Sequence, residues 1–245
     1  MVHWSYHTKE SVELMKTIGL IGGMSWESTV TYYQIVNEAV KKELGGLHSA
    51  KVILYSVEFD EIEKCQAAGE WEKSGDILGK AAQGLEAAGA DFILICTNTM
   101  HKVFDQVQNY VKVPLLHIAQ VTADALKREN ITKVGLLGTK YTMEQDFYKG
   151  KLAENGIDVI IPEKGDIDAV NSIIFDELCR GDIKDASREK YLEIIDGMTA
   201  RGAQGVILGC TEIGLLVRQA DTAAKLFDTT QLHGETAALM SLGKL

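Results

Sequence analysis

The sequence predicts an α/β fold of two pseudo-symmetric lobes, each a mainly parallel sheet flanked by helices. Short apolar runs of strand length alternate with segments of helix length, and part of this pattern occurs twice. Continuous apolar strands that alternate with helices are typical of parallel sheets covered on both faces. We expect strands at residues 17–23, 51–57, 90–96, 113–119, 133–139, 157–162 and 204–210.

Helices are predicted where apolar residues recur at i, i+3, i+4 and i+7, because this spacing places them on one helical face. A last helix, at about 234–244, is expected to pack back onto the first lobe. The spacing is clearest after the first and third strands, at Tyr32, Ile35, Val36 and Ala39 and at Met100, Val103, Phe104 and Val107.

Two segments of the chain are repeated. GADFILICTNTMH (89–101) and GAQGVILGCTEIG (202–214) each join a small-residue turn, an apolar run and a polar loop that opens a helix. IGLIGG (18–23) and VGLLGT (134–139) form a second matching pair. Both pairs recur in the same order at nearly the same separation. We infer that the chain contains a duplicated lobe.

The repeat suggests how the chain is divided into two lobes. The first lobe is expected at 15–115 plus 226–245, and the second at 116–225. Residues 1–14 lack the apolar core of a secretory signal and are expected to be an N-terminal extension.

Composition and charge limit the possible partners. Of the 245 residues, 46% are hydrophobic and only two are proline, which predicts a packed core. A net charge of −10 argues against nucleic acid or an anionic membrane as a partner but is compatible with a small-molecule substrate. No apolar run approaches the roughly 18 residues of a membrane helix. The four cysteines form no CxxC pair and no histidine has zinc-ligand spacing, so we expect a cytoplasmic protein without a metal site.

Aligning Gly89 with Gly202 places Thr97 on Cys210, and each of these two residues stands where a strand turns into a helix. Free N–H groups at such a turn attract a carboxylate and lower the pKa of a thiol. Ligands of open parallel sheets lie beyond the carboxyl ends of the strands. Two polar groups that face each other across a small carboxylate suggest proton exchange at its carbon. For Asn98 and Thr99, simple helix capping is an equally good interpretation.

The motifs GLIGGMSWEST, CTNTMHK and LGCTEIGLL resemble those of the aspartate/glutamate racemases, from about Met15 to the C-terminus. The resemblance implies two pseudo-symmetric lobes with one catalytic cysteine each, within Cys-Asn-Thr and Gly-Cys-Thr. It also implies inversion of an amino acid at Cα without pyridoxal phosphate or another cofactor, and a homodimer.

The chain departs from this family pattern at the first cysteine. The Cys-Asn-Thr motif falls on Thr97-Asn98-Thr99, so threonine replaces cysteine and Cys96 lies one residue earlier. Adjacent strand residues point to opposite faces, so we assign Thr97 to the site and keep Cys96 as the alternative. A threonine hydroxyl is a poor base at neutral pH. Cys210 is therefore the expected base, and by resemblance it acts on the L enantiomer.

The resemblance also suggests which residues bind the substrate. Lys184 resembles a basic group that holds a side-chain carboxylate, although a surface charge is the alternative interpretation. The position of a family arginine falls on Ile62, which makes a neutral or broader range of amino acids credible. The expected binding residues are Met24, Ser25, Gln66, Asn98, Thr99, Thr139, Lys184, Thr211 and Glu212.

Other functions remain open at this point. One is a broad-specificity amino-acid racemase, and another is an amino-acid-binding protein that has lost most of its catalytic activity. A third is a relative that uses the same positions for decarboxylation or maleate isomerisation. A dinucleotide-dependent oxidoreductase is weakly indicated, since GLIGG lacks the G-x-G-x-x-G spacing.

Overall fold

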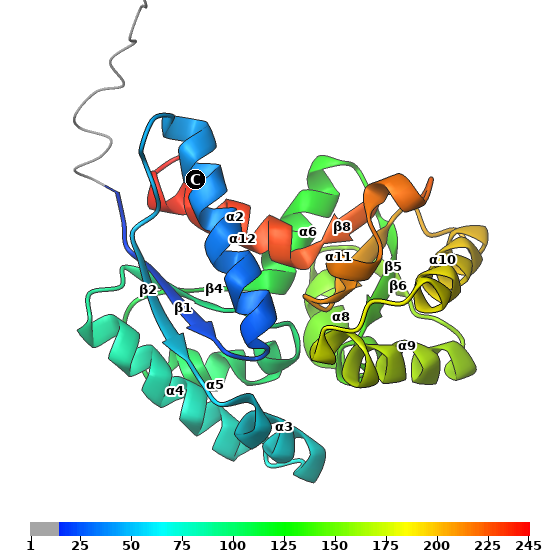
Figure 1. Ribbon diagram of the computed structural model, residues 1–245, viewed down its shortest axis with the longest axis horizontal. Coiled ribbons are helices and arrows are strands. Elements are labelled where there is room, and N and C mark those ends of the chain that lie inside the picture. Colours follow the sequence, from blue (N-terminus) through cyan, green and yellow to red (C-terminus); the bar gives the residue numbers. More distant parts are fainter. Residues whose placement is uncertain (1–14) are drawn as a thin grey trace, which may run out of the picture.

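Two parallel sheets of four strands each form the framework of the protein (Figure 1). The structure is a computed structural model and describes residues 15–245, so the expected extension 1–14 lies outside the described residues. The first sheet has the order β2-β1-β3-β4 and the second the order β6-β5-β7-β8. The strands are β1 (Ile18–Gly22), β2 (Val52–Ser56), β3 (Phe92–Ile95), β4 (Leu115–Leu116), β5 (Lys133–Gly138), β6 (Asp158–Ile160), β7 (Val206–Gly209) and β8 (Leu226–Asp228).

The predicted α/β fold class is confirmed, and the two sheets share one topology. Ile21 pairs with Ile95 in the first sheet, and Leu137 pairs with Leu208 in the second. These pairs are the counterparts expected from the sequence repeat. The matching register means that Thr97 and Cys210 follow their strands at equivalent positions.

The helices and short 3-10 turns fill the connections between strands. In the first half these are α2 (Trp26–Leu44), α3 (Phe59–Ala68), α4 (Trp71–Ala87), η1 (Thr99–Val103) and α5 (Phe104–Gln108). The rest are α6 (Ile118–Arg128), α7 (Lys140–Glu144), α8 (Asp146–Glu154), α9 (Lys164–Asp176), η2 (Leu178–Arg180), α10 (Asp185–Ala200), α11 (Ile213–Leu216), η3 (Gln219–Asp221) and α12 (Thr229–Ser241).

Each sheet is buried on both faces, which explains why its strands are apolar throughout. In the first sheet, Ile21 and Ile95 pack toward α4, whereas Leu20 and Phe92 pack toward α2 and α12. Figure 1 shows α2 and α12 on one side of this sheet and α4 and α5 on the other. The second sheet is covered by α9 and α10 on one face and by α6 and α8 on the other.

The Gly-Ala pair that opens each repeat has a conformational cause. Gly89 has a φ of 97° and Gly202 a φ of 94°, a region that residues with a Cβ rarely adopt. Each glycine reverses the chain after a long helix, so that the following alanine enters a buried strand. The repeated Gly-Ala is therefore required by the repeated backbone path.

The structure extends the second sheet beyond the expected lobe boundary. Residues 226–228 form β8, which pairs with β7 of the second sheet. These three residues were expected in the first lobe, because a strand of this length gives almost no sequence signal. The last helix begins at Thr229, earlier than expected, since the Asp228 carboxylate accepts hydrogen bonds from the N–H groups of Thr230 and Gln231.

Three histidines lie together where the two lobes meet. The His101 ring centroid is 4.8 Å from that of His117 and 5.9 Å from that of His233. His233 Nε2–H donates to the Leu116 carbonyl at 3.0 Å, so its Nδ1 accepts from the Tyr32 hydroxyl at 2.9 Å. Burial lowers the pKa of all three, to about 4 for His117 and about 3 for His233. The junction is thus built from neutral imidazoles.

We expect this histidine cluster to make the fold sensitive to acid. The folded-state pKa values lie below the value of about 6.5 in an unfolded chain. The unfolded chain therefore binds more protons between about pH 6.5 and pH 3, and stability falls as the pH falls through that window. Each buried histidine contributes a slope of up to about 1.4 kcal/mol per pH unit. Urea unfolding at pH 7, 6 and 5 measures this slope.

The variant His233→Gln should unfold more easily at pH 7 but show a flatter pH dependence than the parent protein. His48→Gln, in the loop after α2, is the matched control and should keep the parent slope. An equal slope in His233→Gln would contradict the assignment of acid sensitivity to this cluster.

Candidate functional site

The carboxyl ends of the two sheets face one cavity between the lobes. Its volume is about 20 Å³, little more than the space for one water molecule. Residues from both lobes that the sequence had singled out meet there. The lining consists of Met24, Phe59, Gln66, Thr97, Asn98, Thr99, Thr139, Ile174, Phe175, Cys179, Gly209, Cys210 and Glu212.

Thr97 and Cys210 reach this cavity from equivalent positions. Thr97 comes two residues after the end of β3, and Cys210 comes directly after β7. Cys96 does not line the cavity. Its side chain is fully buried under α2 and α12, beside Tyr32, and burial raises the pKa of its thiol. The alternation of strand side chains thus separates Cys96 from its neighbour Thr97.

A buried carboxylate, Glu212, holds the cysteine side of the site. The Cys210 thiol donates to Glu212 Oε2 at 3.0 Å, and the Thr211 hydroxyl donates to the same oxygen at 2.7 Å. The Ser25 hydroxyl, from the loop after β1, donates to Oε1 at 2.7 Å. Glu212 is only 3% exposed, so its charge depends on these donors. Donors from both lobes therefore converge on one carboxylate.

The surroundings of Cys210 favour the neutral thiol. Burial raises the pKa of the Cys210 thiol well above its usual value, and the negative charge of Glu212 raises it further. The sequence had suggested the opposite, a pKa lowered by a helix N-terminus. The following helix, α11, has only four residues, which gives too small a dipole to outweigh burial. At rest, Cys210 carries its proton.

The Thr97-Asn98-Thr99 turn places polar groups from the first lobe against the second. Asn98 Nδ2 donates to the Thr229 hydroxyl at 3.0 Å, while within residues 15–245 its buried Oδ1 has no hydrogen-bond partner. The hydroxyls of Thr99 and Thr139 lie 3.1 Å apart across the lobe junction. The Asn98 side chain makes no capping bond to η1, so the simple capping interpretation does not describe it.

Met24 and Gln66 also line the cavity from the first lobe. Met24 follows β1, and Gln66 lies near the end of α3, where its Nε2 is 3.1 Å from Met100 Sδ. Gln66 is thus buried and lines the cavity.

Lys184 is the expected binding residue that the structure places elsewhere. Its side chain is 56% exposed at the start of α10, and its ammonium pairs with Glu177 at 3.2 Å. It is absent from the cavity lining, and among residues 15–245 no other lysine or arginine contributes to that lining. Ile62, at the position of the family arginine, is fully buried in the core. Lys184 is therefore a surface cation in this structure, because a nearby carboxylate holds it there.

Several apolar lining residues were missed from the sequence. Phe59 begins α3 just after β2, so its place beyond a strand end was a usable signal. Ile174, Phe175 and Cys179 come from the end of α9 and from η2. No strand ends there, and only the packing of α9 against the second sheet brings them to the site.

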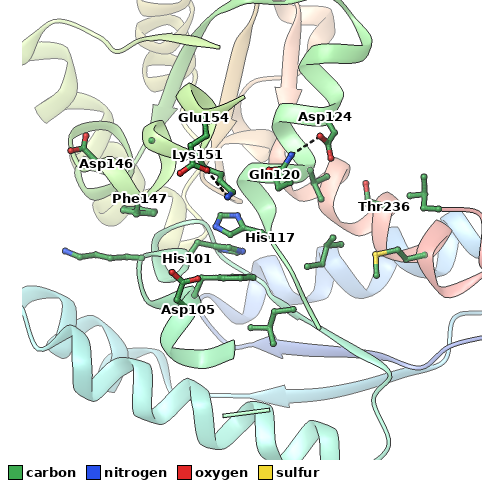
Figure 2. Close-up of a pocket in the computed structure, with 18 of the residues that line it drawn as sticks. His101, Asp105, His117, Gln120, Asp124, Asp146, Phe147, Lys151, Glu154 and Thr236 are labelled. Atoms are coloured by element: carbon green, nitrogen blue, oxygen red, sulfur yellow. Dashed lines mark hydrogen bonds and ion pairs between the residues drawn. The ribbon is translucent and has the colours of Figure 1, made fainter. Parts of the chain in front are cut away.

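A larger cavity of about 860 Å³ lies elsewhere at the lobe junction (Figure 2). It is bordered by His117, Lys151 and Asp105 among others, and none of the expected site residues lines it. The groups able to exchange a proton at carbon therefore converge in the small cavity.

The described part of the chain contains neither a candidate metal site nor a helix able to span a membrane. Within residues 15–245, no three histidine, cysteine, aspartate or glutamate side chains are grouped so as to hold a metal ion. In the same span, no helix combines the length and apolarity needed to cross a membrane.

The chain is similar to known proteins over nearly its whole length. A Yersinia pestis protein proposed to be an Asp/Glu racemase has 54% identity and a TM-score of 0.87, covering 93% of this chain and 100% of that one. An aspartate racemase homologue from Pyrococcus horikoshii OT3 has 38% identity and a TM-score of 0.81, covering 93% and 99%. The broad specificity amino-acid racemase RacX of Bacillus subtilis is 28% identical over 170 residues, 64% of this chain and 69% of RacX.

The family profile agrees with these similarities and with the duplicated lobes. The profile described as Asp/Glu/Hydantoin racemase matches residues 21–237, which include the repeated segments 89–101 and 202–214 and every residue that lines the small cavity. The chain belongs to the Asp/Glu/hydantoin racemase family.

Proposed function

We propose that the protein is a cofactor-independent amino-acid racemase that inverts Cα between Cys210 and Thr97. One observation carries this proposal: residues from equivalent positions of two repeated lobes line one cavity, and each has an exchangeable proton. Inversion requires a group on each face of Cα, one to remove a proton and one to deliver it. Membership of the racemase family supports the same reaction.

On the cysteine side, Glu212 is the proposed proton acceptor for the thiol. The Sγ–H bond already points to Glu212 Oε2 at 3.0 Å. Transfer of this proton leaves a thiolate, which then removes the Cα proton of the L enantiomer and becomes a thiol again. Glu212 therefore holds one proton while the substrate is a carbanion, and it releases this proton to solvent before the next cycle.

On the other side, the Thr97 hydroxyl delivers a proton to the opposite face of Cα and regains one from solvent. The same hydroxyl is a poor base, so removing a proton from the D enantiomer is the slow step. Mirror-image amino acids have equal free energies, and kcat/KM must therefore be equal in both directions. The asymmetry slows inversion both ways but leaves Cys210 free to exchange the proton of L substrates.

The substrate is proposed to bind against the polar turn of the first lobe. Asn98 Oδ1 is buried without a partner in the described chain and can accept a hydrogen bond from a substrate ammonium. Thr99 and Thr139, with Met24, Ser25, Gln66 and Thr211 around them, are the further proposed contacts. A cavity of about 20 Å³ is too small for an amino acid, so the lobes must separate before binding.

A second candidate function is racemisation of amino acids other than aspartate and glutamate. The apolar side chains of Phe59, Ile174 and Phe175 line the cavity, and no lysine or arginine does so within the described residues. An acidic substrate side chain would require Lys184 to leave Glu177. RacX, a broad specificity racemase, shows that such a range occurs among similar proteins.

The function is tested by a polarimetric screen of all L-amino acids without added cofactor. We expect loss of optical rotation for at least one amino acid, and a fall of at least about 100-fold in Cys210→Ala. Cys65→Ala, which removes a buried cysteine away from the cavity, is the matched control. Activity confined to aspartate and glutamate would exclude the broader range, and no activity at all would contradict the proposal.

Proton exchange in heavy water should reveal the asymmetry of the pair. We expect deuterium to enter the Cα position of the L substrate at least about 10 times faster than that of the D substrate, because only Cys210 is an effective base. Mass spectrometry of each enantiomer gives both rates. Equal entry from the two enantiomers would contradict the roles given to Cys210 and Thr97.

Restoring the family cysteine should accelerate inversion. We expect Thr97→Cys to raise kcat for inversion by at least about 10-fold, since a thiol ionises near pH 8.5 and a hydroxyl does not. Thr97→Ser keeps a hydroxyl and is the control, expected to stay within about threefold of the parent. No gain in Thr97→Cys would mean that Thr97 is not the second group.

A further inference from the structure

His101 lies four residues after Thr97 and makes three hydrogen bonds at the lobe junction. Its ring Nδ1 is 2.8 Å from the Thr97 carbonyl oxygen, and its backbone N–H donates to the Asn98 carbonyl at 3.1 Å. Its ring Nε2 accepts from the N–H of Ile118, the first residue of α6, at 3.1 Å. One residue thus joins the turn that carries Thr97 to the start of the next lobe.

The partners of the ring determine its protonation. A backbone N–H can only donate, so Nε2 must carry the lone pair. The Thr97 carbonyl can only accept, so Nδ1 must carry the proton. The ring is therefore a neutral Nδ1–H imidazole, and burial lowers the pKa of His101 well below its usual value, which keeps it neutral.

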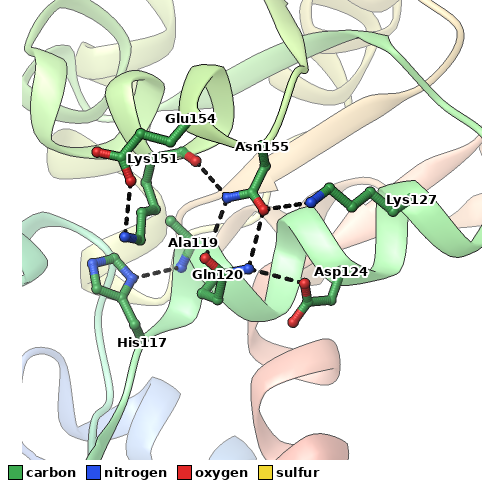
Figure 3. A network of polar contacts seen from close by, with 8 residues as sticks. All are labelled: His117, Ala119, Gln120, Asp124, Lys127, Lys151, Glu154 and Asn155. Atoms are coloured by element: carbon green, nitrogen blue, oxygen red, sulfur yellow. Dashed lines mark hydrogen bonds and ion pairs between the residues drawn. The ribbon is translucent and has the colours of Figure 1, made fainter.

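The neighbouring aromatic rings leave the imidazole little freedom to turn. The ring of Phe104 stacks on it with 5.7 Å between ring centroids. The ring of His117 lies beside it, with 4.8 Å between centroids (Figure 2). His117 Nδ1 also accepts from the Ala119 N–H at 3.1 Å (Figure 3). Two successive N–H groups at the start of α6 are thus bound by two imidazoles, and the bond to His101 joins this end of the helix to η1.

The second lobe has no counterpart of His101. The repeat places Gly214 at the equivalent position, and a Cβ there would collide with the Asp228 carboxylate. The turn that carries Cys210 is held instead by the side chain of Glu212. The two halves of the site therefore have different supports, an imidazole for Thr97 and a carboxylate for Cys210.

We propose that His101 is a positioning residue for Thr97, which holds the Thr97–Thr99 turn in place through the bond from its Nδ1–H to the Thr97 carbonyl. This inference rests on the proposed racemase function. Under this inference, His101 affects the proton transfer by Thr97 but not the one by Cys210. Loss of the bond to the Thr97 carbonyl should slow inversion, which needs both faces of Cα, but spare the exchange that Cys210 performs alone.

Two variants separate the two ring nitrogens. His101→Asn keeps an amide N–H near the position of Nδ1 and loses the bond to α6, whereas His101→Gln places its amide toward Nε2 and loses the bond to Thr97. We expect His101→Gln to lower kcat for inversion by about 10- to 100-fold, a range typical of a small misplacement of a reacting group. Deuterium entry into the L substrate should stay within about threefold. His101→Asn should retain inversion within about threefold.

The control variant is His48→Gln, which changes a histidine in the loop between α2 and β2, away from the carboxyl ends of the strands and from His101. It should leave the ratio of inversion to exchange unchanged. A general structural role for His101 would instead lower inversion and exchange together in His101→Gln. That outcome, or an unchanged ratio, would overturn the inference while leaving the racemase proposal intact.

A crystal structure of His101→Gln tests the inference without measuring activity. We expect the Thr97–Thr99 turn to shift while the hydrogen bonds among Ser25, Cys210 and Glu212 remain. An unshifted turn would overturn the inference. A parent enzyme without exchange or inversion would contradict the proposed function, and the crystal structure would still decide whether His101 holds the turn.

Discussion

The site depends on one buried carboxylate that receives hydrogen bonds from both lobes. Glu212 is 3% exposed, and burying a charge without partners is unfavourable by several kcal/mol. Ser25 from the first lobe and Cys210 from the second both donate to it. The arrangement that satisfies this charge also sets the thiol beside the groups of the opposite lobe. Burial, together with the charge of the same carboxylate, raises the pKa of the Cys210 thiol, so the stable resting state is one in which the cysteine still holds its proton.

The two lobes share one arrangement of strands but differ in the loops that follow them. The two sheets have the same strand order and register, so the residues after β3 and β7 point to a common cavity. The chemistry at these positions differs: hydroxyl and imidazole in the first lobe, thiol and carboxylate in the second. A symmetrical backbone thus carries two chemically different groups, the Thr97 hydroxyl and the Cys210 thiol, at equivalent positions of one cavity.

Much of this arrangement could be predicted from the sequence, because buried parallel strands are continuous apolar runs and the repeat gives their register. The alignment of Gly89 with Gly202 assigned Thr97, and not Cys96, to the site, and Thr97 lines the same cavity as Cys210. Features that depend on tertiary packing could not be predicted. Phe175 reaches the cavity only through the packing of α9, the Glu177 partner of Lys184 lies seven positions away, and the raised pKa of Cys210 results from burial.

The packing of α12, the last helix, against α2 near the start of the chain has a consequence for folding during synthesis. Tyr32 of α2 bonds to His233 of α12, which lies 201 positions later in the chain, and Gly234 lets α12 approach Ile35 closely. On the ribosome, the inner surface of α2 stays without its cover until this late helix emerges. The amino-terminal half therefore cannot complete its own core until the last helix of the chain has been synthesised.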